Sequence, residues 1–155
     1  MKRLVYLFSL LVALTAMQAC QKDDPEPTPP VVGRWTLERV RFSGYPAPFT
    51  SLNADETPSQ YGLSGSFSIK ADKNFDETFG ANGRIVDLKG SWELSNNQLQ
   101  LKYDTGDDET YELDTSREPA KLISTAISAV DTLRNPQTNV VQAVPFKYQF
   151  VYSKQ

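Results

Sequence analysis

The feature that most constrains this chain is a series of short segments in which apolar and polar residues alternate. From Val86 to Leu94 every second position is apolar or glycine, and the positions between them carry Asp, Lys, Ser and Glu. A period of two is typical of a β-strand that buries one face and exposes the other. The same alternation recurs in residues 65–71, 75–79, 99–103 and 110–114. The middle of the chain is therefore expected to form a sheet.

Short turn signals separate these segments. Asn82-Gly83 is a strong two-residue hairpin signal, because both residue types tolerate a positive φ. Two further turns are predicted at residues 95–97 and 105–107. None of these connections is long enough for the crossover that parallel strands need. We therefore expect an antiparallel meander.

The first strand, residues 31–42, changes phase along its length. Trp35 and Leu37 share one face, whereas Val40 lies on the other, which predicts a β-bulge or bend near Arg39. The segment that follows has no sustained period and is interrupted by Gly and Pro, so it predicts a loop. A structureless connection of this length is unusual in a compact domain and is often functional, for example as a lid. A plain surface excursion is the alternative.

This loop spans residues 43–64 and carries three aromatic residues, Tyr45, Phe49 and Tyr61. They are expected to form part of an exposed apolar patch if the protein works through its outer surface. The segment 121–133 also has two interpretations. Its apolar residues would line one face of an amphipathic helix. Its Ile, Val, Ser and Thr content favours a strand, which we expect.

The last strand presents four aromatic residues on one face, Phe146, Tyr148, Phe150 and Tyr152. With it the chain has about eight strands, and such a meander removes its unpaired edges by closing on itself. The expected fold is all-β, an antiparallel up-and-down barrel of about eight strands over residues 32–155. The interior of a barrel of this size is either filled by side chains or holds one small ligand.

The start of the chain predicts export. Lys2 and Arg3 precede an apolar run of about thirteen residues, too short to span a bilayer, which needs roughly twenty. Ala19 directly before Cys20 resembles the lipobox of bacterial lipoproteins. That resemblance implies a signal peptide over residues 1–19 and a Cys20 that carries lipid, with fatty acids such as palmitate anchoring the chain in a membrane. An ordinary secretory signal with an incidental cysteine is the alternative.

Residues 20–31 are expected to be a tether, because Pro25–Pro30 is an extended, semi-rigid spacer. Lys22-Asp23-Asp24 resembles the export signal of Bacteroidota-type lipoproteins, which implies an outer-membrane anchor and a cell-surface position. A plain polar linker is the alternative, and it leaves open whether the protein faces the periplasm or the exterior.

Three motifs of the body resemble the lipocalin-like domains of such lipoproteins: Gly33-Arg34-Trp35, the phenylalanines of residues 67–79, and Gly90-Ser91-Trp92-Glu93-Leu94. The resemblance implies a small-molecule-binding barrel that is not an enzyme. In lipocalins the first tryptophan packs at the closed end beneath an arginine of the last strand. Here the last strand offers Lys147 and Lys154 instead.

The composition excludes several kinds of chemistry. The chain has no histidine and a single cysteine, which removes the commonest general base and the usual nucleophile pairs. No glycine-rich phosphate loop is present, and no cofactor is expected. Without Lys2 and Arg3, 14 of the 16 basic residues remain against 19 acidic ones, a formal charge of −5 that argues against nucleic acid.

The acidic residues offer two weaker possibilities. Asp104 to Glu109 concentrates carboxylates in one turn, which could hold calcium. The spaced ligands of a calcium loop are absent, so a solvated turn is preferred and no metal site is predicted. A hydrolase would need two carboxyl groups that face each other in a cleft. Most acidic residues fall in turns or on predicted outer faces.

The aromatic residues are the remaining candidates. Their ordinary role is to fill the core, but some could line a pocket for an apolar or sugar-like ligand. The candidate ligand-binding residues are Trp35, Phe67, Trp92, Tyr103, Tyr111, Phe146, Tyr148 and Phe150. The leading hypothesis is a membrane-anchored binding protein for a small hydrophobic molecule. The alternative is a structural or accessory surface lipoprotein that acts through a protein partner.

Overall fold

The computed structural model describes residues 27–155. The predicted signal segment 1–19, the predicted lipidation site Cys20 and most of the tether lie outside the described residues. The elements, in chain order, are β1 (Gly33–Ser43), η1 (Thr50–Leu52), β2 (Asp55–Glu56), η2 (Pro58–Tyr61), β3 (Leu63–Ile69), β4 (Asn74–Ala81), β5 (Arg84–Ser95), β6 (Gln98–Tyr103), β7 (Asp108–Asp114), β8 (Lys121–Ser124), β9 (Ile127–Arg134) and β10 (Val141–Lys154).

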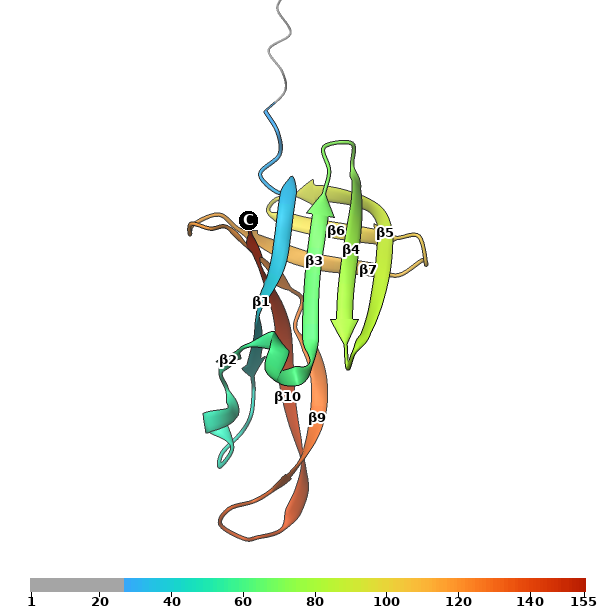
Figure 1. Ribbon diagram of the computed structural model, residues 1–155. Coiled ribbons are helices and arrows are strands. Elements are labelled where there is room, and N and C mark those ends of the chain that lie inside the picture. The colour runs from blue at the N-terminus through green and yellow to red at the C-terminus, as the bar shows by residue number, and fades with distance from the viewer. Residues whose placement is uncertain (1–26) are drawn as a thin grey trace, which may run out of the picture.

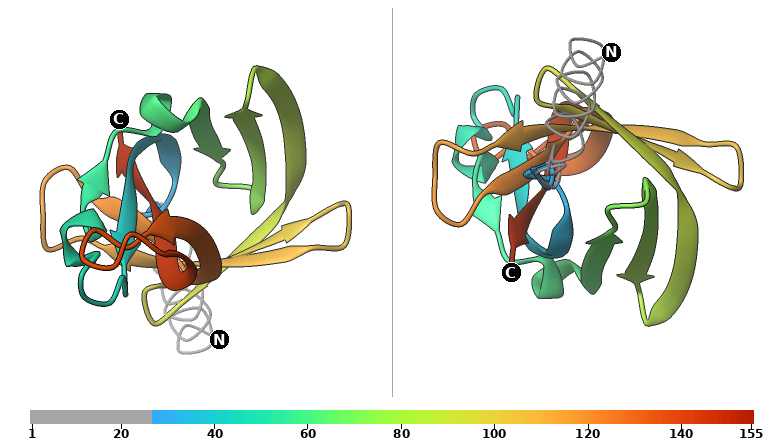
Figure 2. Two further views of the ribbon diagram at one scale, coloured as in Figure 1. Left: turned by 90° about the horizontal axis from the view of Figure 1, so that it is seen from below. Right: turned by 90° about the horizontal axis from the view of Figure 1, so that it is seen from above.

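The strands form one antiparallel sheet that closes on itself (Figures 1 and 2). Eight strands go round the barrel in the order β1-β3-β4-β5-β6-β7-β8-β10, and β10 pairs with β1 to close it. Two further strands lie outside the ring, β2 against β1 and β9 against β10. The predicted all-β barrel of about eight strands is confirmed, with two extra strands.

The phase change in the first strand has the predicted cause. The pairing of β1 with β10 shifts its register between Leu37 and Arg39, which leaves Glu38 as the extra residue of a β-bulge. Trp35 and Leu37 before the bulge and Val40 after it are all buried. The bulge therefore lets one strand contribute to the barrel interior and then, through Phe42, to a second cluster of buried residues formed by Tyr45, Phe49 and Val144.

The segment 121–133 is a strand, as expected, but it is broken in two. Ile123 pairs with Val151 and Ile127 with Tyr148, so three residues of this segment oppose two of β10. This bulge turns β9 away from the barrel. β8 pairs with both β7 and β10, whereas β9 pairs with β10 alone. The prediction of one continuous barrel strand is therefore wrong beyond Ser124.

The expectation of a structureless loop at 43–64 is also wrong. The segment carries η1, β2 and η2, and Asn53 holds its start through bonds between its side-chain amide and the backbone of Tyr45. Tyr45 stacks on Phe146 with ring centroids 4.7 Å apart, and Phe49 is buried beside Val144. Tyr45 and Phe49 therefore help to form a second small core outside the barrel, not an exposed patch.

One end of the barrel is closed by the two tryptophans. Trp35 Nε1 donates to the Val31 carbonyl at 2.8 Å, and Trp92 Nε1 donates to the Lys70 carbonyl at 2.9 Å. Lys154 of the last strand lies over Trp35, with its Nζ 5.7 Å from the ring centroid. A lysine thus occupies the position that an arginine holds in lipocalins. The chain enters β1 at this end, and the β9–β10 hairpin projects from the other (Figure 1).

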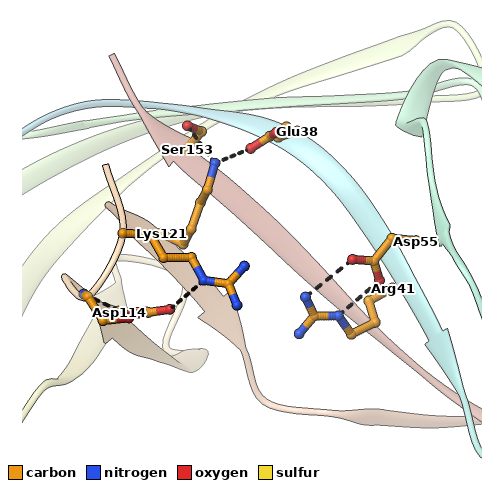
Figure 3. A network of polar contacts seen from close by, with 8 residues as sticks. Glu38, Arg41, Asp55, Asp114, Lys121 and Ser153 are labelled. Carbon is orange, nitrogen blue, oxygen red and sulfur yellow. Dashed lines mark hydrogen bonds and ion pairs between the residues drawn. The ribbon is translucent and has the colours of Figure 1, made fainter. Parts of the chain in front are cut away.

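Lys121 links the strands that close the barrel on its outer surface. Lys121 Nζ on β8 contacts Glu38 of β1 and Ser153 of β10, so one side chain joins three neighbouring strands (Figure 3). On the extension of the sheet, Arg41 pairs with Asp55 of β2 at 2.9 Å. Surface pairs of this kind contribute between zero and about 1 kcal/mol each, so the barrel depends mainly on its interior.

Candidate functional site

The end of the barrel away from the tryptophans is open. β6 pairs with β5 only from Gly90 onward, so the first half of β5 pairs with β4 alone and extends beyond the ring. Its inward residue Val86 is 49% exposed, in contrast to the buried tryptophans. Phe79 of β4 and Phe150 of β10 meet across this end with ring centroids 5.8 Å apart. The inner wall here is apolar and accessible.

A cleft opens in the wall beside this end, where β9 turns away from β7. The last backbone bond across the gap runs from Thr125 N to the Thr110 carbonyl, at 3.0 Å. Beyond it lies a cleft of about 320 Å³. Its lining residues are Asp108, Glu109, Thr110, Tyr111, Ser124, Thr125, Ile127 and Phe150. The bulge that separates β8 from β9 is therefore what creates this opening.

Two carboxyl groups and two tyrosines form a hydrogen-bonded cluster, of which Glu109 and Tyr111 line the cleft. Tyr103 Oη lies 2.7 Å from Glu77 Oε2 and 3.1 Å from Glu109 Oε2. Tyr111 Oη donates to the same Glu109 oxygen at 2.6 Å. Because one hydroxyl contacts both carboxyls, their oxygens lie within about 6 Å of each other. We call these four residues the carboxyl–tyrosine network.

A glycine makes the network possible. Phe75, Gly90 and Tyr103 are aligned on three neighbouring strands, so Gly90 lies between the two rings. A Cβ at Gly90 would come within 2.0 Å of the Lys102 carbonyl oxygen and 2.9 Å of the Phe75 ring. With no side chain there, Phe75 and Tyr103 pack edge to face, 5.1 Å apart. The Tyr103 hydroxyl then reaches Glu77 on β4.

The hydrogen bonds of the network depend on one proton. The Tyr103 hydroxyl carries one proton and donates to only one of its two carboxyl neighbours. It donates to Glu77 at 2.7 Å when Glu77 is ionised, and it is free to donate to Glu109 at 3.1 Å when a protonated Glu77 donates to it instead. Burial raises the pKa of Glu77 to about 7; the bond to Tyr103 opposes this shift, and the charge of Glu109 adds to it. Below about pH 7, where Glu77 is protonated, the proton chain runs from Glu77 through Tyr103 to Glu109.

The network holds negative charge that no ion pair balances in the described part of the chain. Neither Glu77 nor Glu109 belongs to an ion pair among residues 27–155. Burial, followed by the neighbouring carboxyl groups, raises the pKa of Tyr103, and burial and its neighbours raise the pKa of Tyr111. Both tyrosines therefore stay neutral and act as hydrogen-bond donors.

The predicted ligand-binding aromatics fall into three groups. Trp35, Phe67 and Trp92 are fully buried and pack the closed end and the centre. Tyr103 and Tyr111 belong to the carboxyl–tyrosine network, and Phe150 lines the cleft. Phe146 lies outside the barrel interior, in the second core with Tyr45, and Tyr148 lies between Phe146 and Phe150. The structure brings together three of the eight, Tyr103, Tyr111 and Phe150.

The two carboxyl groups were missed as site residues. Most acidic side chains were expected in turns or on outer faces; Glu77 is an exception because it is only 6% exposed, whereas Glu109 is exposed near the start of β7. Glu77 shares its face of β4 with Phe75 and Phe79, and Glu109 precedes Tyr111 by two positions on β7. Each carboxyl therefore lies on the same strand face as buried aromatic residues, and this alternation was the sequence signal that could have identified both as site residues. The Tyr103 hydroxyl fills the space between the carboxyls, where a hydrolase would hold the scissile bond.

Two other sequence features can be placed. The acidic turn before β7 is exposed, and the described part of the chain contains no group of three or more residues able to hold a metal ion. Among residues 27–155 no helix has the length and apolar character needed to cross a membrane.

Comparison with known proteins gives one match. The model of a family described as a lipocalin-like domain matches residues 31–117. No curated protein and no solved structure matches the chain significantly. The matched segment ends before β8, so it contains the carboxyl–tyrosine network but not β9, which forms one wall of the cleft.

Proposed function

We propose that this chain, which belongs to the lipocalin-like domain family, is a membrane-anchored binding protein. The barrel fold of that family is suited to holding small ligands. The ligand is a small molecule with an apolar part, held at the open end of the barrel and in the cleft between β7 and β9. The single observation that carries the proposal is the contrast between the two ends. One end is sealed by buried tryptophans, and the other exposes apolar side chains around a polar network.

The filled interior limits how deep the ligand enters. Phe67 at the centre contacts the rings of Phe75, Tyr111 and Tyr152, with centroids 4.6 to 6.3 Å apart. These side chains occupy the space that a deep ligand would need. The proposed ligand therefore lies shallow, above Tyr111 and against Phe150, and not beside Trp35.

The orientation of the barrel supports membrane-associated binding. The described chain enters at the closed end, where Val31 is buried and Lys154 Nζ bonds the Pro30 carbonyl at 2.6 Å. We propose that lipid on Cys20 holds this end toward an outer membrane, most simply on the cell surface. The open end then faces away from the bilayer and is accessible to ligands in solution.

Native mass spectrometry of the full chain, purified from its own host, tests the binding proposal. A small molecule should co-purify with the wild-type chain and be lost from Phe150→Ser, which removes one wall of the cleft. Val130→Ser, on the exposed outer face of the hairpin, serves as the matched control and should keep the molecule. A clean unliganded mass for the wild-type chain would count against the proposal.

Membrane fractionation tests the anchor separately. A Cys20→Ala variant should leave the membrane fraction, because a single sulfur carries the lipid, and its barrel should remain folded. If the variant remained in the membrane fraction, the anchor would have to be something other than lipid on Cys20.

One observation favours the alternative of a surface accessory protein. Among residues 27–155, β9 has no neighbour on one edge, and the hairpin exposes Val130, Val140 and Val141, with Val130 67% exposed. An unpaired apolar edge is a ready template for pairing with another protein strand. If a protein partner captured by the wild-type chain were lost with Val130→Lys but retained by Phe150→Ser, the alternative would be supported.

A further inference from the structure

We propose that the ligand carries a protonated amine, which binds on the cleft side of the carboxyl–tyrosine network, at Glu109 and close to Glu77, while its apolar part lies against Tyr111, Phe150 and Ile127 in the cleft. This inference rests on the proposed function and adds to it the chemical class of the ligand. Four observations support it: a buried carboxyl with an unused acceptor, the absence of a compensating cation, the aromatic walls, and the proton held in the network.

The first observation concerns Glu77. The residue is only 6% exposed, yet among the described residues only its Oε2 has a hydrogen-bond partner. Every fully buried polar side-chain atom in residues 27–155 has a partner, so Oε1, which has none, keeps some exposed surface. A carboxyl group buried to this extent, with one oxygen that no donor of the described chain contacts, is an acceptor without a donor. Burial of such a group is unfavourable unless a donor completes it.

The second observation is the sign of the charge. Tyr111 and Tyr103 supply neutral donors, while no lysine or arginine of the described chain pairs with Glu77 or Glu109. An ammonium group brings three donors and no acceptor, which complements two carboxyl groups. A fatty acid would instead place its carboxylate against Glu109, with like-charge repulsion. The site therefore selects cationic over anionic amphiphiles.

The third observation is the wall of the cleft. The rings of Tyr111 and Phe150 lie on it beside the apolar side chain of Ile127. Aromatic faces attract cations and also cover apolar surface, so they suit the carbon chain or ring attached to an amine. The volume of about 320 Å³ fits a small molecule and not a polymer.

The fourth observation links binding to protons. On the two strands that pair with β4, Glu77 faces the apolar residues Phe67 of β3 and Leu88 of β5. From strands further round the barrel, Tyr103, Glu109 and Tyr152 also face Glu77. None of these is a cation. An ammonium group favours the charged form of Glu77, so its arrival releases the proton that the network holds. Amine binding should therefore strengthen as the pH rises.

Isothermal titration of the detergent-solubilised full chain tests the inference, with 2-phenylethylamine as the probe and 2-phenylethanol as its neutral analogue. A primary amine keeps its charge over this range, as lysine does. The amine should bind more tightly than the alcohol at pH 8. Because the pKa of Glu77 is about 7, the affinity of the chain for the amine should fall by up to about 30-fold between pH 8 and pH 5.5. The alcohol should show no such change.

Variants separate the network from general charge effects. Glu109→Gln should weaken amine binding by at least about tenfold, the effect of losing one charged contact. Glu77→Gln should remove the pH dependence. Glu112→Gln, on the outward face of the same strand as Glu109, removes an equal charge and should change neither.

Each other outcome overturns the inference. Equal binding of amine and alcohol, unaffected by Glu109→Gln, would show a cleft that does not recognise the ammonium, and the proposed binding function would stand. Absence of binding by both probes would reject the cleft as a site for a protonated amine with an apolar part. The native mass measurement would then decide the binding function independently.

Discussion

Replacing Glu77 with glutamine should change how the stability of the barrel depends on pH. Glutamine has nearly the same shape, and its amide can still donate to Tyr103 Oη. It cannot titrate. The comparison of the two proteins therefore isolates the proton that Glu77 holds in the folded state.

The size of the effect follows from the shift of one pKa. Burial raises the pKa of Glu77 from 4.5 to about 7 in the folded chain. Between these values the folded protein keeps a proton that the unfolded chain has lost, so the free energy of unfolding decreases as the pH rises. The slope is about 1.4 kcal/mol per pH unit, and the loss between pH 5 and pH 8 is about 2 to 3 kcal/mol. Below pH 4.5 the contribution is fully present.

Urea unfolding followed by tryptophan fluorescence measures this directly, because Trp35 and Trp92 are both buried in the folded barrel. The wild-type protein should lose about 2 to 3 kcal/mol more than Glu77→Gln between pH 5 and pH 8, and the variant should be the more stable of the two at pH 8. Glu112→Gln is the control for a lost surface charge. Parallel pH profiles for wild type and Glu77→Gln would refute the protonated network.

Two other substitutions test the packing that positions the site. Gly90→Ala should destabilise the barrel by more than about 2 kcal/mol through overpacking, since its Cβ would meet the Lys102 carbonyl. Gly83→Ala is the control, because Gly83 has φ +76 and no atom within 4 Å of the added Cβ. It should lower the free energy of unfolding by only about 1 kcal/mol in the same urea assay. Equal costs would contradict the close approach at Gly90. Trp35→Phe should lower the free energy of unfolding by about 2 to 4 kcal/mol, measured by calorimetry, because the smaller ring leaves a gap and cannot form the hydrogen bond to Val31. A change below about 0.5 kcal/mol would show that the closed end does not depend on Trp35.

The barrel could be predicted because the sequence features that specify it lie close together along the chain. Alternation with a period of two and turn residues such as Asn82-Gly83 set the meander, and the phase change after Leu37 located a bulge. The departure of β9 could not be predicted in the same way. No glycine or proline interrupts residues 121–133, and only the pairing with β10 shows that three residues oppose two.

The second core and the carboxyl–tyrosine network depend on contacts distant in sequence. Tyr45 is buried because Phe146 supplies the ring on which it stacks, about a hundred residues away in the chain. Glu77 lies in phase with phenylalanines, which indicated an inward carboxyl. Its partners come from β6 and β7, and the missing side chain of Gly90 on β5 lets Tyr103 reach it.

The most direct test is an NMR titration of the ¹³C-labelled full chain with 2-phenylethylamine at pH 8. The carboxyl carbons of Glu77 and Glu109 and the ring signals of Tyr111 and Phe150 should shift together, while the indole signals of Trp35 and Trp92 at the closed end stay in place. Shifts confined to the second core around Phe146, with the two carboxyl signals unchanged, would contradict the placement of the binding site at the open end of the barrel.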